Sequence, residues 1–469
     1  MIARLVGLAA SVAMLQAACS QETIDPRANP DEALIATLTD IDPDPDVVHV
    51  SLMAVEAEVS FLDGTPTKVW AYVDGNAADP IPSVPGPTLV AKPGDLVIVD
   101  FENALPIDAT TIHWHGIRLD SAMDGAGNHH GDEVFPGESF QYRFVARDAG
   151  TFWYHPHVRA DEQVERGLFG AVVVREEAGF HSERLIVLDD VDLGATGELD
   201  IEPSEEDIMM GRHGETILVD GRVEPELSGA AGGVERWRIV NAANGRYFAI
   251  EAGGRTMRIV ESDGGALLAP IETTLLRVVP GERYTVDVEL SGEAGDLIEV
   301  TSRPVDTGHG AIATADQALF TVRLDNRAAT SPPPLKAVPF EPLLDPSATV
   351  SRELVLRETS SPELGVGFSI NDEAWPFNTP LEGVTGASER WRIVNDSDGA
   401  HPFHLHGMFF QVLDDGAPRA DLGWKDTVDV PAQAMLDLAV PLATGKWMFH
   451  CQILEHAERG MMGEIHVAP

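Results

Sequence analysis

Thiols are nearly absent from this sequence, which has only two cysteines, Cys19 and Cys451. Because Cys19 lies in a segment with the features of a leader, the mature chain keeps no pair of cysteines in its core that could form an internal disulfide. Aromatic residues are also scarce, at 6% of the chain. Hydrophobic residues nevertheless reach 44%, and together with 43 glycines they are typical of a globular, turn-rich β protein.

Positive charge is scarce as well. The chain has 32 Lys and Arg against 76 Asp and Glu, which gives a formal net charge of −44 and a pI near 4.5. Such a surface repels nucleic acid and anionic lipid, and it raises the local concentration of cations. We therefore expect no nucleic-acid partner. The acidity is also compatible with a merely solvated surface in a salty medium.

Long hydrophobic runs are confined to the first twenty residues. MIARLVGLAASVAMLQAACS has one early charge, Arg4, then an apolar run and small residues, which indicates a secretory signal too short to span a membrane. LQAAC approximates the pattern at which bacterial lipoproteins are cleaved and lipidated, although Gln16 fits it poorly. We expect a signal over 1–19, no transmembrane segment, and a periplasmic protein that is either released or anchored to the outer membrane through a lipid on Cys19.

The rest of the chain repeats itself. ERWRIVN occurs at 235–241 and again at 389–395, and a looser copy, GDLVIVDFEN, occupies 94–103. In ERWRIVN charged and apolar residues alternate, which is the period of a half-buried strand. A second pair of segments, GTFWYHPH (150–157) and GKWMFHCQ (445–452), aligns with a glycine and a histidine five residues apart in each.

These repeats predict three copies of one domain, at 45–175, 183–326 and 345–469. The middle copy has no histidine in the places where the other two have them. Helical periodicity is scarce, and short alternating segments are separated by Gly and Pro turns. We therefore expect an all-β chain of three consecutive β-sandwich or barrel domains.

A soft metal site is predicted around Cys451. Neighbouring side chains on a strand point to opposite faces, so Cys451 faces one way while His450 and Gln452 face the other. The sequence offers Cys451 three partners: His401, His456 and Met461. Two imidazoles, a thiolate and a distant thioether form the trigonal blue-copper arrangement. The alternative is an inert buried cysteine beside core methionines.

Histidines gather on the opposite face. Three H-x-H motifs and the residue before Cys451 supply seven imidazoles: His113, His115, His155, His157, His404, His406 and His450. Each H-x-H pair projects to one side of its segment. Seven imidazoles are too many for one copper, and no closed set of four suits zinc. A cluster of two or three coppers between the end domains accounts for all of them, with only a few covalent bonds between it and Cys451.

Together these four stretches resemble the four copper motifs of the multicopper oxidases, most of all the bacterial three-domain laccases and cuprous oxidases. The likeness extends over essentially the whole mature chain, with the motifs in the same order and with the same internal spacing. It implies three cupredoxin-like domains with Greek-key topology. It also implies one-electron oxidation of a reducing substrate at a type 1 copper, and reduction of O2 to water at a trinuclear cluster, so that up to four copper ions are expected.

The resemblance also implies the ligands of each copper. It assigns the type 1 copper to His401, Cys451, His456 and Met461. It assigns the type 2 copper to His113 and His404, one type 3 copper to His157, His406 and His450, and the other type 3 copper to His115 and His155. That last copper would normally take a third histidine, but Gln452 occupies the position. We expect this copper to be loosely held, or completed by Gln452 or by water.

Acidic residues near the motifs carry the remaining assignments. Asp124 matches the family residue near the type 2 copper that orders water and relays protons, and its alternative is a turn aspartate. The glutamate that bacterial relatives carry directly after the type 1 histidine is Ala457 here, with Glu458 one place later. The segment WKDTVDV (424–430) resembles the segment beside the type 1 site, where we interpret Asp426 as structural.

The sequence therefore predicts a copper-dependent oxidase that takes single electrons from Cu(I) or a phenol-like substrate and passes them to O2. The competing hypothesis is a non-catalytic copper protein, either a storage or electron-transfer module or a cupredoxin scaffold. Gln452 and Ala457 favour that hypothesis. The other eleven ligand positions, nine histidines with Cys451 and Met461, favour the oxidase.

Overall fold

The structure is a computed structural model, and it describes residues 35–62, 64–127, 132–175, 182–309, 315–361 and 365–469. The expected signal over 1–19, with Cys19, lies outside the described residues. Among the described residues the α-helices are five or six residues long: α1 (Ala160–Glu165), α2 (Glu205–Met210) and α3 (Leu454–Glu458). None of them is long and apolar enough to cross a membrane. Strands dominate, which confirms the expected all-β class.

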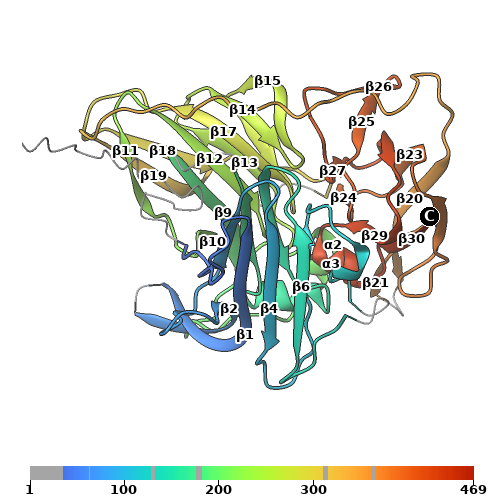
Figure 1. The fold of residues 1–469 in the computed structure, drawn as a ribbon, viewed down its shortest axis with the longest axis horizontal. Coiled ribbons are helices and arrows are strands. Elements are labelled where there is room, and N and C mark those ends of the chain that lie inside the picture. The colour runs from blue at the N-terminus through green and yellow to red at the C-terminus, as the bar shows by residue number, and fades with distance from the viewer. Residues whose placement is uncertain (1–34, 63, 128–131, 176–181, 310–314, 362–364) are drawn as a thin grey trace, which may run out of the picture.

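Six sheets form three pairs, which Figure 1 colours blue to cyan, green to yellow and orange to red along the chain. The first pair contains β1 (Val47–Leu62), β2 (Thr65–Asp74), β3 (Gly86–Ala91), β4 (Leu96–Asn103), β5 (His113–His115), β6 (Ser139–Val145), β7 (Gly150–His155) and β8 (Gly170–Val174). The second contains β9 (Glu183–Val191), β10 (Thr216–Val219), β11 (Glu226–Ala230), β12 (Val234–Asn241), β13 (Phe248–Ala252), β14 (Met257–Ser262), β15 (Gly265–Thr273), β16 (Leu276–Val278), β17 (Arg283–Glu289), β18 (Leu297–Ser302) and β19 (Gln317–Asp325). The third contains β20 (Arg352–Ser361), β21 (Gly365–Ile370), β22 (Leu381–Val384), β23 (Ser388–Asn395), β24 (His401–Leu405), β25 (Gln411–Asp414), β26 (Ala417–Pro418), β27 (Thr427–Val430), β28 (Met435–Pro441), β29 (Gly445–Cys451) and β30 (Met462–Ala468). Each pair of sheets is called a domain below.

The repeated sequences form the same strand in each domain. The two ERWRIVN copies lie in β12 and β23, each parallel to the first strand of its domain, β9 or β20, and antiparallel to a later one, β17 or β28. The looser copy, β4, is likewise parallel to β1 and antiparallel to β6. The internal repeat of the sequence is therefore a repeat of strand topology.

An asparagine ends each of these three strands and has the same contacts in all of them. The side-chain amides of Asn103, Asn241 and Asn395 are buried, and each donates to a backbone carbonyl of the loop that follows and to another 31–37 residues further along the chain. Their side-chain oxygens each accept a backbone N–H two residues further on. Buried polar groups need such partners, so the asparagine fixes the loop. In the end domains that loop leads to the histidine-bearing strands β5 and β24.

The end domains share one core. A single cluster of buried side chains runs through the first and third domains, including Trp114, Phe152, Trp391 and Phe449. The middle domain has its own core around Trp237. Because the shared core joins the two end domains, the ends of β7 and β29 meet, and His157, just after β7, contacts His450 of β29.

Candidate metal centre

Two strand pairs bring the H-x-H motifs together. In the first domain β5 runs antiparallel to β7 with His113 opposite His155, and in the third domain β24 runs antiparallel to β29 with His404 opposite His450. The two strand pairs occupy equivalent places in the repeat. All seven imidazoles of the expected cluster are buried. Burial and convergence therefore come from the pairing of short strands at the seam between the end domains.

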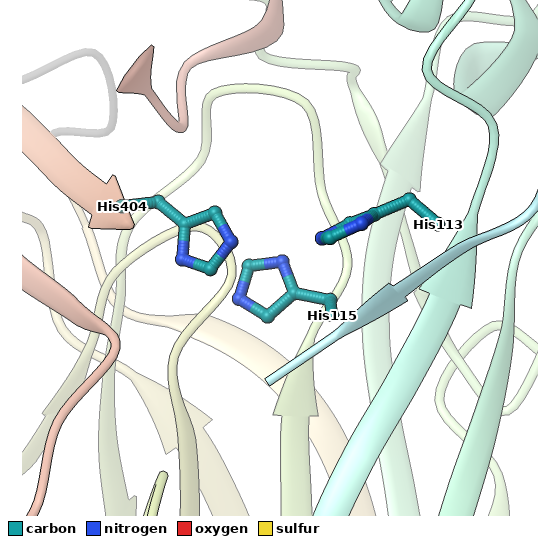
Figure 2. A group of neighbouring side chains, drawn as sticks. All are labelled: His113, His115 and His404. Carbon is teal, nitrogen blue, oxygen red and sulfur yellow. The ribbon is translucent and has the colours of Figure 1, made fainter. Parts of the chain in front are cut away.

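His113, His115 and His404 form the first group, shown in Figure 2. The rings of His115 and His404 stack with centroids 3.8 Å apart, and the His113 ring meets them edge-on at 5.8 Å and 5.9 Å. His155 lies beside this group, with its ring centroid 5.3 Å from that of His113 and 5.7 Å from that of His115. The structure thus places His115 with both residues assigned to the type 2 copper, and His155 next to it.

His157, His406 and His450 form the second group, the same set that the resemblance implies for one type 3 copper. Nε2 of His450 lies 3.3 Å from Nε2 of His157 and 3.0 Å from Nε2 of His406. Burial and then the neighbouring imidazoles lower the pKa of all three, that of His450 to about 3. The rings are therefore neutral near pH 7, and their nitrogens can offer lone pairs to one cation.

The outward nitrogens of the rings are held by the protein. Four Nδ1 atoms donate to backbone carbonyls at 2.8–3.0 Å: those of His113, His155, His404 and His450. Within the described residues, the Nε2 atoms of His113, His155 and His404 are buried with no hydrogen-bond partner. His115 is reversed, with Nδ1 unpartnered there and Nε2 lying 3.1 Å from Thr427 Oγ1. A metal-ligating histidine hydrogen-bonds to the protein through one ring nitrogen and binds the metal through the other. These residues show that pattern, so they fit copper.

Asp124 contacts both groups. Its Oδ2 lies 2.7 Å from Nδ1 of His406, and its backbone carbonyl accepts from Nδ1 of His113. Oδ1 is buried and has no hydrogen-bond partner among the described residues. Asp124 directly follows the one-turn 3-10 helix η1 (Ser121–Met123), which fixes its position. The carboxylate therefore orients one ring and leaves an oxygen that can hold a water or a proton.

Cys451 faces away from these two groups and lies with His401 and His456. Its Sγ is 3.5 Å from Nδ1 of His401 and 3.7 Å from Nδ1 of His456, and those two nitrogens are 3.1 Å apart. Burial raises the pKa of the Cys451 thiol and lowers that of His456. A bound cation is therefore what would stabilise the thiolate here, because metal ligation deprotonates cysteine.

Met461 adjoins the Cys451 group through its backbone. Met461 is fully buried, its carbonyl accepts from the Cys451 N–H, and its own N–H donates to the His456 carbonyl, both at 3.0 Å. Phe368 covers the ring of His456, with centroids 4.1 Å apart. The loop between α3 and β30 thus ties the backbone of Met461 to those of Cys451 and His456.

Gln452 lies next to the first histidine group. Its side chain is buried, and its Oε1 has no partner among the described residues. A Cβ placed on Gly281 would lie 2.6 Å from Cγ of Gln452 and 3.1 Å from Cε1 of His115, so both side chains border the same turn. The structure therefore brings Gln452 to the side of His115.

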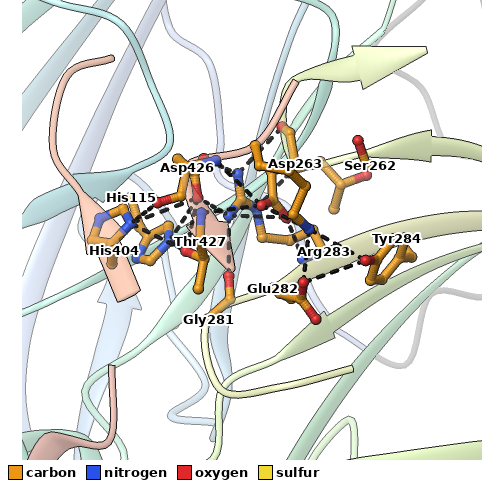
Figure 3. Close-up of polar contacts among 12 residues, drawn as sticks. His115, Ser262, Asp263, Gly281, Glu282, Arg283, Tyr284, His404, Asp426 and Thr427 are labelled. Atoms are coloured by element: carbon orange, nitrogen blue, oxygen red, sulfur yellow. Dashed lines mark hydrogen bonds and ion pairs between the residues drawn. The ribbon is translucent and has the colours of Figure 1, made fainter. Parts of the chain in front are cut away.

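Asp426 lies at the end of its segment that is remote from the type 1 ligand His401. The segment runs beside the type 1 site as its resemblance indicated, with Val430 opposite His401 in the sheet. The Oδ1 atom of Asp426 lies 3.3 Å from Nε2 of His115 and 3.6 Å from Nδ1 of His404. Its carboxylate is paired with Arg283 of the middle domain, as Figure 3 shows. Burial acts to raise the pKa of Asp426, but the charge and hydrogen bonds of Arg283 hold that pKa well below its usual range. Arg283 lies 143 residues away in the chain, and no local motif marks it.

Three family models match the chain, at residues 55–179, 190–318 and 349–469, and each describes a multicopper oxidase. The chain belongs to the multicopper oxidase family. It is 28% identical to the multicopper oxidase mco of Staphylococcus aureus over 437 residues, which cover 89% of this chain and 88% of that one.

Solved structures of multicopper oxidases share this fold. A Campylobacter jejuni multicopper oxidase, described as a metallo-oxidase, is 27% identical with a TM-score of 0.78, covering 92% of this chain and 94% of that one. A laccase-like multicopper oxidase of Ochrobactrum is 25% identical with the same TM-score of 0.78, covering 92% and 99%. The expected cupredoxin-like fold is therefore confirmed.

Some relatives are named for cell division and not for an oxidase activity. The cell division protein FtsP of Escherichia coli is 28% identical over 452 residues, which cover 88% of each chain. Similarity within this multicopper oxidase family therefore does not by itself establish catalysis. The chemistry of this chain has to be argued from its own residues.

Proposed function

We propose that this multicopper oxidase takes single electrons from a reducing substrate and passes them to O2. The mononuclear copper would be held by His401, Cys451, His456 and Met461, and a trinuclear cluster by His113, His115, His155, His157, His404, His406 and His450. Copper supplies one-electron redox chemistry at the first site and reduction of O2 at the second. The observation that carries the proposal is the set of buried, unpartnered ring nitrogens on four of the cluster histidines.

The two sites are connected by adjacent residues. Cys451 and His450 are neighbours in β29, and their side chains point to opposite faces. Nδ1 of His450 also donates to the Cys451 carbonyl at 2.8 Å, and its Nε2 faces His157 and His406. A short covalent path with a parallel hydrogen bond therefore runs from the thiolate to the second histidine group.

The electron donor would meet the mononuclear site at His401. Nε2 of His401 lies 2.9 Å from Ser397 Oγ and 3.4 Å from a carboxylate oxygen of Glu358, whose side chain is 15% exposed. The other oxygen of Glu358 lies 3.4 Å from Nε2 of His309. A carboxylate at this edge, on a chain with a formal charge of −44, favours a cation such as Cu(I) over a neutral phenol.

A non-catalytic role is the second candidate, favoured by Gln452 and by the FtsP relative. An absorption spectrum of the copper-loaded protein with a copper count separates the possibilities. An intense blue band with four coppers per chain supports the oxidase. A blue band with one copper supports an electron-transfer protein, and no blue band supports a scaffold.

We also propose that the protein acts in the periplasm. The leader at 1–19 supports export, and Cys19 is either lipidated, which anchors the chain to the outer membrane, or removed with the leader. Mass spectrometry of the mature N-terminus distinguishes the two, because only the anchored form begins with a lipid-modified Cys19.

Replacing Met461 by leucine is expected to keep the blue colour and raise the reduction potential of the mononuclear copper. The axial thioether bond is long and weak, so it tunes the site without creating it. Met462→Leu is the control, because Met462 packs in a small cluster with Met448 and should leave the potential unchanged. A colourless Met461→Leu protein would mean that Met461 is needed to form the site.

Replacing Gln452 by histidine is expected to raise the copper content of the cluster, since imidazole suits copper better than an amide oxygen. The blue band should not change, because Cys451 faces the other way. Copper per chain and O2 consumption are compared with wild type, and O2 consumption rises if a poorly held copper limits turnover. Gln411→His, at a buried glutamine bonded to residues 341 and 343, is the control. If Gln452→His binds less copper and has a disturbed blue spectrum, Gln452 does not face the copper cluster.

A further inference from the structure

The middle domain contributes no histidine to the expected copper sites, yet one of its turns reaches them. This turn, residues 279–283, connects β16 to β17. Glu282 N–H donates to the Val279 carbonyl at 3.0 Å, and Gly281 N–H donates to the Asn241 carbonyl at 2.9 Å. Gly281 has a φ of +80°, a conformation that favours glycine. The turn is therefore tightly defined, and it is anchored by the asparagine that ends β12.

Arg283, the last residue of the turn, forms an ion pair with Asp426 of the third domain. Its Nη1 lies 2.7 Å from Oδ1 and its Nη2 lies 2.5 Å from Oδ2, so the pair is bidentate, and both side chains are 1% exposed (Figure 3). Buried bidentate pairs of this kind fix orientation, because both hydrogen bonds require one geometry.

Asp426 passes this orientation to two imidazoles. Its Oδ1 lies 3.3 Å from Nε2 of His115 and accepts from Thr427 Oγ1 at 2.9 Å. Thr427 Oγ1 in turn lies 3.1 Å from both Nε2 of His115 and Nδ1 of His404. These are the nitrogens that do not face the copper space, so Asp426 and Thr427 together hold the outer edges of both stacked rings.

Gly281 reaches the same place through its backbone. A Cβ added at Gly281 would lie only 2.6 Å from Cγ of Gln452 and 3.1 Å from Cε1 of His115. A side chain here would displace Gln452, which stands where the family's third histidine is missing. The turn therefore lies directly against the half of the cluster with the fewest imidazoles.

A network of charged side chains surrounds the turn. The simplest interpretation of this network is that it attaches the middle domain to the third domain. Lys425 Nζ lies 2.8 Å from Glu282 and 3.0 Å from Asp263, and Asp263 also accepts from the Arg283 backbone N–H at 2.9 Å. Replacing a buried ion pair by apolar residues is often neutral for stability, so attachment alone gives weak reason for one. A role in domain attachment alone does not explain why Asp426 also contacts the rings of His115 and His404.

We propose that the middle-domain turn 279–283 is a positioning element of the copper cluster, with Arg283 fixing Asp426 against His115 and His404 and Gly281 seating Gln452 beside His115. This proposal rests on the proposed copper oxidase function. The turn compensates for the missing histidine by holding His115, one of the two remaining imidazoles of that copper, and Gln452 in place.

The test uses the full chain loaded with copper and then dialysed against a weak chelator. Arg283→Gln should keep the blue band and its one copper, while the affinity for cluster copper falls about 10- to 100-fold, the usual cost of losing a group that orients ligands. The paramagnetic resonance signal of the type 2 copper should change as well, since His404 loses its support. Arg236→Gln is the control: Arg236 forms an equally buried bidentate pair with Asp287 in the same domain, at 2.7 Å and 2.9 Å.

Arg283→Gln leaves Asp426 buried without its cation, so the double variant R283Q/D426N supplies a neutral version. It is expected to fold and still to lose cluster copper. Retention of all cluster copper with an unchanged type 2 signal in both variants would overturn the proposal. So would an equal loss in Arg236→Gln, or unfolding of both Arg283 variants, since the pair would then only attach the domain. A wild-type protein that holds no cluster copper would overturn the proposed function as well.

Discussion

Replacing Cys451 by serine is expected to abolish the intense blue colour and reduce oxidase activity to background. A hydroxyl cannot supply the soft thiolate that gives the charge-transfer band, and the path from the donor edge to His450 begins at this sulfur. The cluster histidines lie on the other face of β29, so copper bound there should remain. The measurement is an absorption spectrum, a copper count and an O2 consumption rate on the same preparation.

The copper count is the internal control of this experiment. A loss of one copper per chain with the others retained is the expected result, because only the trigonal set around Cys451 is altered. A variant that stays blue would contradict the assignment of the mononuclear site to His401, Cys451 and His456. A variant that loses every copper would contradict the separation of the two sites by the faces of the strand.

Replacing Asp124 by alanine is expected to lower the copper affinity of the cluster about 10- to 100-fold, with a similar loss of oxidase rate. Nδ1 of His406 would lose its partner at 2.7 Å, and that ring would be free to turn away from His450. The blue band should be unchanged, because Asp124 has no contact with the Cys451 group. Copper retention under dialysis and O2 consumption are the measurements.

Two further variants make this prediction specific. Asp124→Asn should retain more copper than Asp124→Ala, because its side-chain oxygen can still accept from His406. Asp120→Ala is the matched control, since Asp120 is an exposed residue that caps η1 through Ala122 N–H and has no hydrogen bond to a histidine among the described residues. If Asp124→Ala keeps wild-type copper and rate, Asp124 is only a turn residue.

The sequence determined the chemistry of each strand face. Side chains alternate along a strand, so a cysteine between two residues of another face has to point away from them. The structure accordingly places Cys451 with His401 and His456, and His450 with His406. The ERWRIVN copies likewise predicted equivalent strands, because a repeated pattern of buried and exposed residues requires the same neighbours in each domain.

The tertiary structure alone decided how these strands are supported around the expected cluster. The resemblance of segment 424–430 did not predict that Asp426, at the end of this segment away from His401, lies against His115 and His404. Nothing in the sequence marks Arg283 or Gly281, which lie in a domain without ligand histidines. The free nitrogen of each ring was also undetermined, and it is Nδ1 for His115 but Nε2 for its neighbours. Backbone geometry sets the face of a side chain within two residues, whereas contacts between domains depend on the packing of whole surfaces, which no local pattern specifies.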